Sequence, residues 1–243
     1  MARKTRPKSK YKRIILKLSG EALRNRETRL SIDPNITLSV AKRVRTALEM
    51  DVETAVVIGG GNIIRGMAGE ALGMGRIAGD SMGMLATVIN ALALKDALEK
   101  IGVESRVQTA VKMDQLAEPL IIGRAVSHLS KGRVVIFAGG TGNPFFTTDT
   151  TAALRASEIG ADVLLKATKV NGIYSADPMT NPRAKRYTKI SYVEALKKQL
   201  KIMDASAFSL CMENNIPIVV FDFFRAGNIR RVLEGRAVGT MVS

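Results

Sequence analysis

The sequence is poor in residues on which several common kinds of protein site depend. Its 243 residues include one cysteine, Cys211, and one histidine, His128. A single cysteine excludes a disulfide framework within the chain and a metal site built from clustered cysteines, and a single histidine excludes most types of zinc site. Tryptophan is absent and aromatic residues make up 5% of the chain, which argues against a surface that binds nucleic acid by base stacking.

Long hydrophobic runs are lacking as well. The longest stretch without a charged residue, Val134–Thr148, contains three glycines and a proline. It is shorter than the roughly 20 apolar residues that cross a bilayer. Lys12, Arg13 and Lys17 interrupt the apolar residues that follow the basic N-terminus, so we expect no signal peptide. These absences predict a soluble protein of a reducing compartment.

Positively charged residues outnumber negatively charged ones in this sequence. The formal net charge is +15, and seven of the positive charges fall within the first 13 residues. We expect residues 1–11 to form a basic, disordered tail and residues 12–243 to form a single domain. Such a tail weakly attracts polyanions, but it lacks the helical pattern and interleaved aromatic residues of a specific nucleic-acid reader. A basic body also suits small ligands that carry several phosphates.

Short apolar segments rich in β-branched residues alternate with amphipathic segments along the rest of the chain. The pattern predicts strands at 12–18, 54–58, 103–107, 133–137, 162–165 and 217–221. Helices are predicted at 34–50, 81–100, 122–129, 150–159, 192–203 and 228–234, and a flap at 169–189. Asp33-Pro34 is typical of a helix start, and Ser191 with Glu194 forms a capping box. This alternation predicts an α/β fold with a largely parallel sheet.

Four polar segments that contain or adjoin glycine follow predicted strands. They are 17–20 (KLSG), 59–65 (GGGNIIR), 139–149 (GGTGNPFFTTD) and 166–177 (KATKVNGIYSAD). In open α/β sheets, ligands bind beyond the carboxyl ends of the strands. We therefore expect these four segments to meet at one edge of the sheet and to form a ligand site there.

The triple glycine Gly59-Gly60-Gly61 offers backbone N–H groups that no side chain shields, which suits a phosphate. A tight turn from strand to helix explains it equally well. Ile64 stands where a dinucleotide fingerprint needs its third glycine, and the chain contains no Gly-Lys dipeptide for a Walker A motif. Arg65, one turn further on, favours the phosphate interpretation, because a guanidinium binds phosphate in a bidentate manner.

Two lysines lie in otherwise apolar strands. Lys17 falls within IILKLSG and Lys166 within VLLKATK. A single strand lysine is best explained as facing solvent. Two at the ligand edge favour phosphoryl transfer, in which the protein mainly aligns the reactants and stabilises charge.

The loop at 141–148 combines threonine hydroxyls and an amide with two phenylalanines. These groups suit a hydroxylated, heterocyclic ligand, with Phe145 and Phe146 as a wall for its base. As an alternative, Thr148 or Asp149 only caps the helix that follows, and Asp80 only caps the helix predicted from residue 81. His128 and Cys211, in apolar surroundings, are interpreted as packing residues.

Taken together, these segments resemble the bacterial-type uridine monophosphate kinases of the amino acid kinase superfamily. The matching stretches are KLSGEAL (17–23), VVIGGGN (56–62), RG (65–66), GDSMGMLATV (79–88), GTGNPFFTTD (140–149), LKATKVNGIYSADP (165–178) and MDASAF (203–208). GTGNPFFTTD is the most specific of them. The resemblance implies a three-layer fold with a mostly parallel sheet between helix layers, a UMP lobe at about 12–150 and an ATP lobe at about 151–243.

The resemblance also implies roles for individual residues. ATP would be bound by Lys17, Leu18, Ser19, Gly20, Gly61, Arg65, Thr168, Tyr174 and Asp177. UMP would be bound by Gly60, Asp80, Thr141, Gly142, Asn143, Pro144, Phe145, Phe146, Thr147 and Thr148. The catalytic residues would be Lys17, Arg65, Asp149 and Lys166, in which Asp149 orients the two lysines. Mg²⁺ would be held chiefly by the nucleotide phosphates, with no metal site made by the protein.

The activity implied is transfer of the γ-phosphoryl group of ATP to UMP, giving UDP and ADP in cytoplasmic de novo pyrimidine nucleotide synthesis. A homohexamer inhibited by UTP and activated by GTP is also implied. Asn171 replaces the aspartate usual in the family, and the charged segment 24–30 departs from its pattern, which leaves activation by GTP open. Two alternatives remain: another small-molecule kinase of the same superfamily, and a polyanion-binding protein acting through the tail.

Overall fold

The computed structural model describes residues 9–25, 27–64, 73–176, 180–181, 183–200 and 202–243. Within these ranges, nine strands form one sheet in the order β4-β3-β5-β2-β1-β6-β8-β9-β7. The strands are β1 (Arg13–Leu18), β2 (Glu53–Ile58), β3 (Ser105–Thr109), β4 (Glu118–Pro119), β5 (Val134–Ala138), β6 (Val163–Thr168), β7 (Lys189–Ile190), β8 (Ile218–Asp222) and β9 (Thr240–Val242). Neighbouring strands are parallel except β8 and β9, which are antiparallel. The mostly parallel sheet is confirmed.

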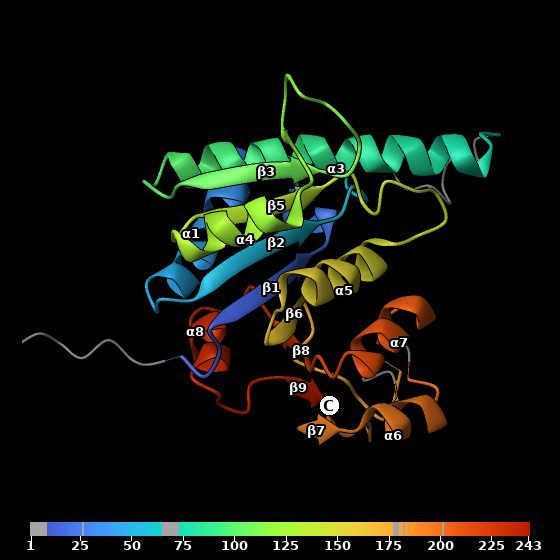
Figure 1. The fold of residues 1–243 in the computed structure, drawn as a ribbon. Coiled ribbons are helices and arrows are strands. Elements are labelled where there is room, and N and C mark those ends of the chain that lie inside the picture. Colours follow the sequence, from blue (N-terminus) through green and yellow to red (C-terminus); the bar gives the residue numbers. More distant parts are fainter. Residues whose placement is uncertain (1–8, 26, 65–72, 177–179, 182, 201) are drawn as a thin grey trace, which may run out of the picture.

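Helices cover both faces of this sheet (Figure 1). One layer consists of α1 (Pro34–Leu48), α3 (Arg76–Glu99) and α8 (Asn228–Leu233). The other consists of α4 (Ile122–Ser130), α5 (Thr148–Ile159), α6 (Tyr192–Lys197) and α7 (Ala205–Glu213). A short 3-10 helix, η1 (Gly20–Ala22), follows β1. The three-layer α/β architecture is therefore confirmed.

Successive side chains of a strand point to opposite faces of the sheet, and this alternation decides where the two strand lysines lie. In β1, Leu16 and Leu18 belong to the core beneath α1, whereas Ile15 belongs to the core beneath α5. Lys17 therefore points toward the α5 layer. In β6, Leu164 packs in the α5 core, so Lys166 points the same way.

The structure differs from the expected elements mainly at their ends. Helix α3 begins at Arg76, five residues before the predicted start. The helix predicted at 192–203 ends early, at Lys197, because Gln199 adopts a left-handed φ of 51° after α6. A separate helix, α7, begins after its cap Asp204. The strands β4, β7 and β9 have two or three residues each, too few to show an alternating pattern in the sequence.

Residues 9–11, which the sequence analysis places at the end of the tail, contact the domain. The backbone N–H of Lys10 donates to the carbonyl oxygen of Leu233 at 2.8 Å, and Tyr11 is buried. Residues 1–8 lie outside the described ranges. The strands before residue 150 lie on one side of β1 and the later strands on the other; the assignment of these halves to UMP and ATP remains a prediction.

Candidate functional site

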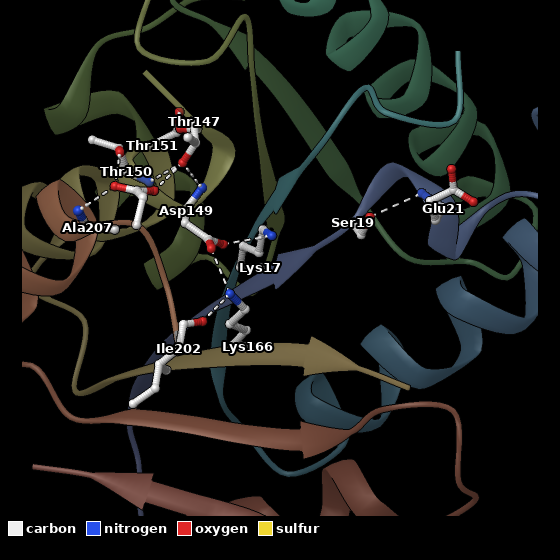
Figure 2. A network of polar contacts seen from close by, with 11 residues as sticks. Lys17, Ser19, Glu21, Thr147, Asp149, Thr150, Thr151, Lys166, Ile202 and Ala207 are labelled. Carbon is white, nitrogen blue, oxygen red and sulfur yellow. Dashed lines mark hydrogen bonds and ion pairs between the residues drawn. The ribbon is translucent and has the colours of Figure 1, made fainter. Parts of the chain in front are cut away.

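Two lysines and a carboxylate meet at the carboxyl ends of β1 and β6. Lys17 and Lys166 are paired in register on these neighbouring strands. Asp149, in the first turn of α5, has Oδ1 2.7 Å from Nζ of Lys17 and Oδ2 2.7 Å from Nζ of Lys166. Nζ of Lys166 also donates to the carbonyl oxygen of Ile202 at 2.6 Å. Figure 2 shows both ammonium groups directed at the one carboxylate, so the structure brings together three of the four expected catalytic residues.

Burial and charge act against each other in this cluster. Burial by itself raises the pKa of Asp149, but the charges of Lys17 and Lys166 outweigh it and hold that pKa below its ordinary value. Burial lowers the pKa of Lys166, and Asp149 offsets only part of that effect. The carboxylate is therefore ionised at neutral pH and lies between two lysine side chains, an arrangement that suits a phosphoryl group.

The start of α5 is held by contacts that the sequence analysis did not identify. Thr147 caps this helix, because its Oγ1 accepts from the backbone N–H of Asp149 at 3.0 Å. The proposed alternative of a cap at Thr148 or Asp149 is therefore wrong. Asp204 accepts from the hydroxyl of Thr150 at 2.9 Å and from that of Thr147. Its position before an apolar helical run was the available signal, since Asp204 also caps α7.

Two glycine turns touch each other beside the lysines. A Cβ on Gly20 would lie 2.2 Å from Oδ1 of Asn62 and 2.6 Å from the carbonyl oxygen of Gly59. A side chain at position 20 is therefore excluded by the turn that follows β2. Ser19 accepts from the backbone N–H of Glu21 at 3.3 Å. The side chain of Leu18 is fully buried in the core beneath α1, so only its backbone is placed to meet a ligand.

A cavity of about 280 Å³ opens between α3, the glycine turn and the 140–148 loop. Its lining includes seven residues assigned to nucleotide binding from the resemblance, namely Gly60, Gly61, Asp80, Asn143, Phe146, Thr147 and Thr148. Thr141, Gly142, Pro144 and Phe145 belong to the same loop but are not among the lining residues. The structure therefore gathers residues from three separate segments around one hollow.

Asp80 holds the loop at this cavity. Its Oδ2 accepts from the backbone N–H of Phe145 at 2.8 Å and from Nε of Arg76 at 2.8 Å. Because α3 begins at Arg76 with Gly75 at the N-cap position, Asp80 lies inside the helix. The interpretation of Asp80 as a helix cap is therefore wrong.

Two more of the expected ATP residues, Thr168 and Tyr174, lie at the end of β6 and shortly after it. Thr168 donates its hydroxyl hydrogen to the carbonyl oxygen of Val170 at 2.6 Å, and Tyr174 donates to Oδ1 of Asn171. Asn171, the departure from the family pattern, thus holds the Tyr174 side chain. Arg65 and Asp177 lie outside the described residues, and their expected roles stay predictions.

The two residues interpreted as packing residues are buried or nearly so. Cys211, on the buried side of α7, is fully buried, and burial raises the pKa of its thiol to about 12. His128 has Nε2 3.1 Å from Glu118 and Nδ1 3.2 Å from Arg133. Neither residue lines the cavity beside the glycine turns.

Sequence and structure comparisons identify relatives of this chain. The model of the amino acid kinase family matches residues 12–222. The UMP kinase of Bacillus anthracis is 38% identical with a TM-score of 0.93, and the match covers 96% of each chain. The UMP kinase of Ureaplasma parvum is 38% identical with a TM-score of 0.90, covering 96% of this chain and 98% of that one. The uridylate kinase of Archaeoglobus fulgidus is 28% identical with a TM-score of 0.71, covering 95% and 99%. The chain therefore belongs to the amino acid kinase family and groups within it with the UMP kinases.

Proposed function

We propose that this protein transfers the γ-phosphoryl group of ATP to UMP, giving UDP and ADP. The observation that carries the proposal is the placement of Lys17 and Lys166, held 2.7 Å from one carboxylate at the edge where the two glycine turns meet. The similarity to UMP kinases supports UMP as the acceptor of the phosphoryl group. An oxygen of the UMP phosphate attacks the γ-phosphorus while the bond to the β–γ bridging oxygen breaks.

The chain's own residues align the two phosphates and offset charge during this displacement. Lys17 and Lys166 bind oxygens of the transferring group, whose negative charge spreads in the transition state. Asp149 keeps both ammonium groups in place without taking part in bond changes. Backbone N–H groups of the glycine turns bind the phosphate groups that are not transferred, as at other glycine-rich phosphate sites.

Mg²⁺ bound to the nucleotide phosphates would neutralise part of their charge. The described residues contain no cluster of three or more histidine, cysteine, aspartate or glutamate side chains. Both oxygens of Asp149 face lysine ammonium groups, so this carboxylate is poorly suited to bind a cation. These features support a metal ion carried by the nucleotide.

Activity toward CMP is expected to be about 10–100-fold lower than toward UMP in kcat/KM. Cytosine exchanges a donor for an acceptor at the edge where uracil meets the 141–148 loop, which leaves buried polar groups unpaired. A coupled assay with UMP, CMP, dTMP and acetylglutamate measures this preference. Equal turnover of UMP and CMP would contradict it, and turnover of acetylglutamate alone would support a different kinase of the superfamily.

Replacing Asp80 with alanine is expected to raise the KM for UMP by about 10–100-fold and to leave the KM for ATP nearly unchanged. We propose that the carboxylate accepts hydrogen bonds from the UMP ribose, and it also holds the loop through Phe145. Initial rates with each substrate varied in turn separate the two constants. Asp80→Asn, which retains one acceptor oxygen, serves as the milder control. Equal changes in both KM values would remove Asp80 from the UMP site.

We also propose a cytoplasmic homohexamer in pyrimidine nucleotide synthesis that is inhibited by UTP. One feature that supports self-association is a group of exposed apolar side chains on α3, namely Ile77, Met82, Leu85 and Ile89.

Of the helices that the structure describes, α3 alone has the length and hydropathy of a membrane span. It packs against α1 and β3, which is the position of a core helix.

A further inference from the structure

Two buried asparagines lie behind the glycine turn that follows β2. Asn62 ends this turn and Asn90 comes from the middle of α3, and the two residues are 5% and 0% exposed. Nδ2 of Asn62 donates to Oδ1 of Asn90 at 3.0 Å, and Nδ2 of Asn90 donates to Oδ1 of Asn62 at 2.7 Å. The two carboxamides therefore form a reciprocal pair inside the protein.

The second hydrogen of each amide binds the backbone. Nδ2 of Asn90 donates to the carbonyl oxygen of Gly59 at 2.7 Å, and Nδ2 of Asn62 donates to that of Ser31 at 2.7 Å. All four N–H bonds of the two carboxamides are thus used. The pair joins three segments that are far apart in the sequence: the approach to α1, the glycine turn and α3.

The glycine turn packs between α3 and the turn after β1 so closely that neither Gly60 nor Gly20 has room for a side chain. A Cβ on Gly60 would lie 2.7 Å from Cβ of Ala86 and 2.7 Å from the carbonyl oxygen of Gly83. On the other side, Oδ1 of Asn62 approaches the position of a Gly20 Cβ to 2.2 Å. Gly59, Gly60 and Gly61 have no side chains, and the backbone N–H of Gly59 donates to the carbonyl oxygen of Leu18 at 3.0 Å. Beyond that bond, the orientation of the turn depends on these contacts and on the amide pair.

We propose that Asn62 and Asn90 are positioning residues, which set the direction of the backbone at Gly60 and Gly61 before any nucleotide binds. The inference rests on the proposed function, because it assigns the turn to phosphate binding. Buried polar networks stabilise one arrangement when every member is satisfied, and they lose that arrangement when one member is removed. A displacement of about 1 Å at reacting groups can lower a rate by about 10²-fold.

Asn62→Ala and Asn90→Ala are each expected to lower kcat for UMP phosphorylation by about 10–100-fold. The double variant is expected to lose no more than the worse single variant, because either change breaks the same link. Isosteric Asn62→Asp and Asn90→Asp repeat the test with packing retained, since a carboxylate cannot donate to Gly59 or Ser31. All rates are measured well below the melting temperature of each variant.

Thr54→Ala is the matched control. Thr54 is fully buried and donates to the carbonyl oxygen of Val52 at 2.9 Å, at the end of β2 that lies away from the site. It is expected to lower the melting temperature without changing kcat. The proposal is overturned if folded asparagine variants keep kcat within about twofold of wild type, or if the loss in the double variant equals the product of the single losses.

Two further measurements remain decisive if the variants do not fold or the acceptor is not UMP. In the wild-type protein without nucleotide, the backbone order parameter of Gly61 is expected near 0.85, as in rigid backbone; a value below about 0.6 would overturn the proposal. Calorimetry of ADP binding tests phosphate binding by the glycine turn without any phosphoryl acceptor present. Failure of wild-type protein to phosphorylate UMP would reject the proposed function, whereas undiminished ADP affinity in the asparagine variants would reject the positioning role.

Discussion

Replacing either Lys17 or Lys166 with methionine is expected to lower kcat by about 10²–10³-fold. Methionine keeps most of the apolar stem of lysine and removes only the charge. That charge acts mainly in the transition state, so the KM values for ATP and UMP should change much less than kcat. Single-turnover rates of phosphoryl transfer, with folding checked by circular dichroism, measure the effect.

The double variant and a surface lysine complete this test. Both ammonium groups act on one displacement, so the loss in the double variant should be smaller than the product of the two single losses. Lys189→Met is the matched control, because Lys189 also lies in a strand but is exposed to solvent. Near-native rates in both single variants would remove the two lysines from the mechanism.

Replacing Asp149 with asparagine is expected to lower the free energy of unfolding by about 3 kcal/mol, because two largely buried ammonium groups lose their common counter-charge. The side chains of Lys17, Lys166 and Asp149 are only 13%, 16% and 15% exposed. Activity should fall as well. Among the residues that the structure describes, Asp149 provides the side-chain contact that holds the ammonium group of Lys17 in place. Urea denaturation of the variant and of wild type measures the stability change.

A second substitution separates charge from packing at this position. Adding Lys17→Met to Asp149→Asn removes one of the unpaired charges, so part of the lost stability should return while activity does not. If the double variant is less stable than Asp149→Asn alone, unpaired charge is not the cause of the loss.

The pH dependence of stability gives an independent check on the same carboxylate. The pKa of Asp149 lies below its ordinary value in the folded protein. Its stabilising contribution is therefore complete at neutral pH and is lost as the pH falls below about 4. The unfolding free energy of wild type should fall more steeply over that range than that of Asp149→Asn. Parallel curves would contradict the assignment.

The sequence by itself determined the fold class and the sheet edge at which the candidate site lies. Local signals were sufficient for the starts of two helices, since Asp33-Pro34 starts α1 and the Ser191 capping box starts α6, as expected. The alternation of strands and helices required a parallel sheet, and the polar segments then had to meet at its carboxyl edge. The motif GTGNPFFTTD indicated the family, which the comparisons confirm.

Only the tertiary structure decided which atoms meet at that edge. Lys17 and Asp149 are 132 positions apart in the sequence but their charged atoms are 2.7 Å apart, and no local pattern distinguishes such a lysine from one that faces solvent. The same holds for the contact of Asp204 with the start of α5 and for the pairing of Asn62 with Asn90. Helix caps and strand periods depend on neighbours along the chain, and the sequence shows them directly. Contacts between distant segments depend on register and packing, which arise only when the sheet and its two helix layers assemble.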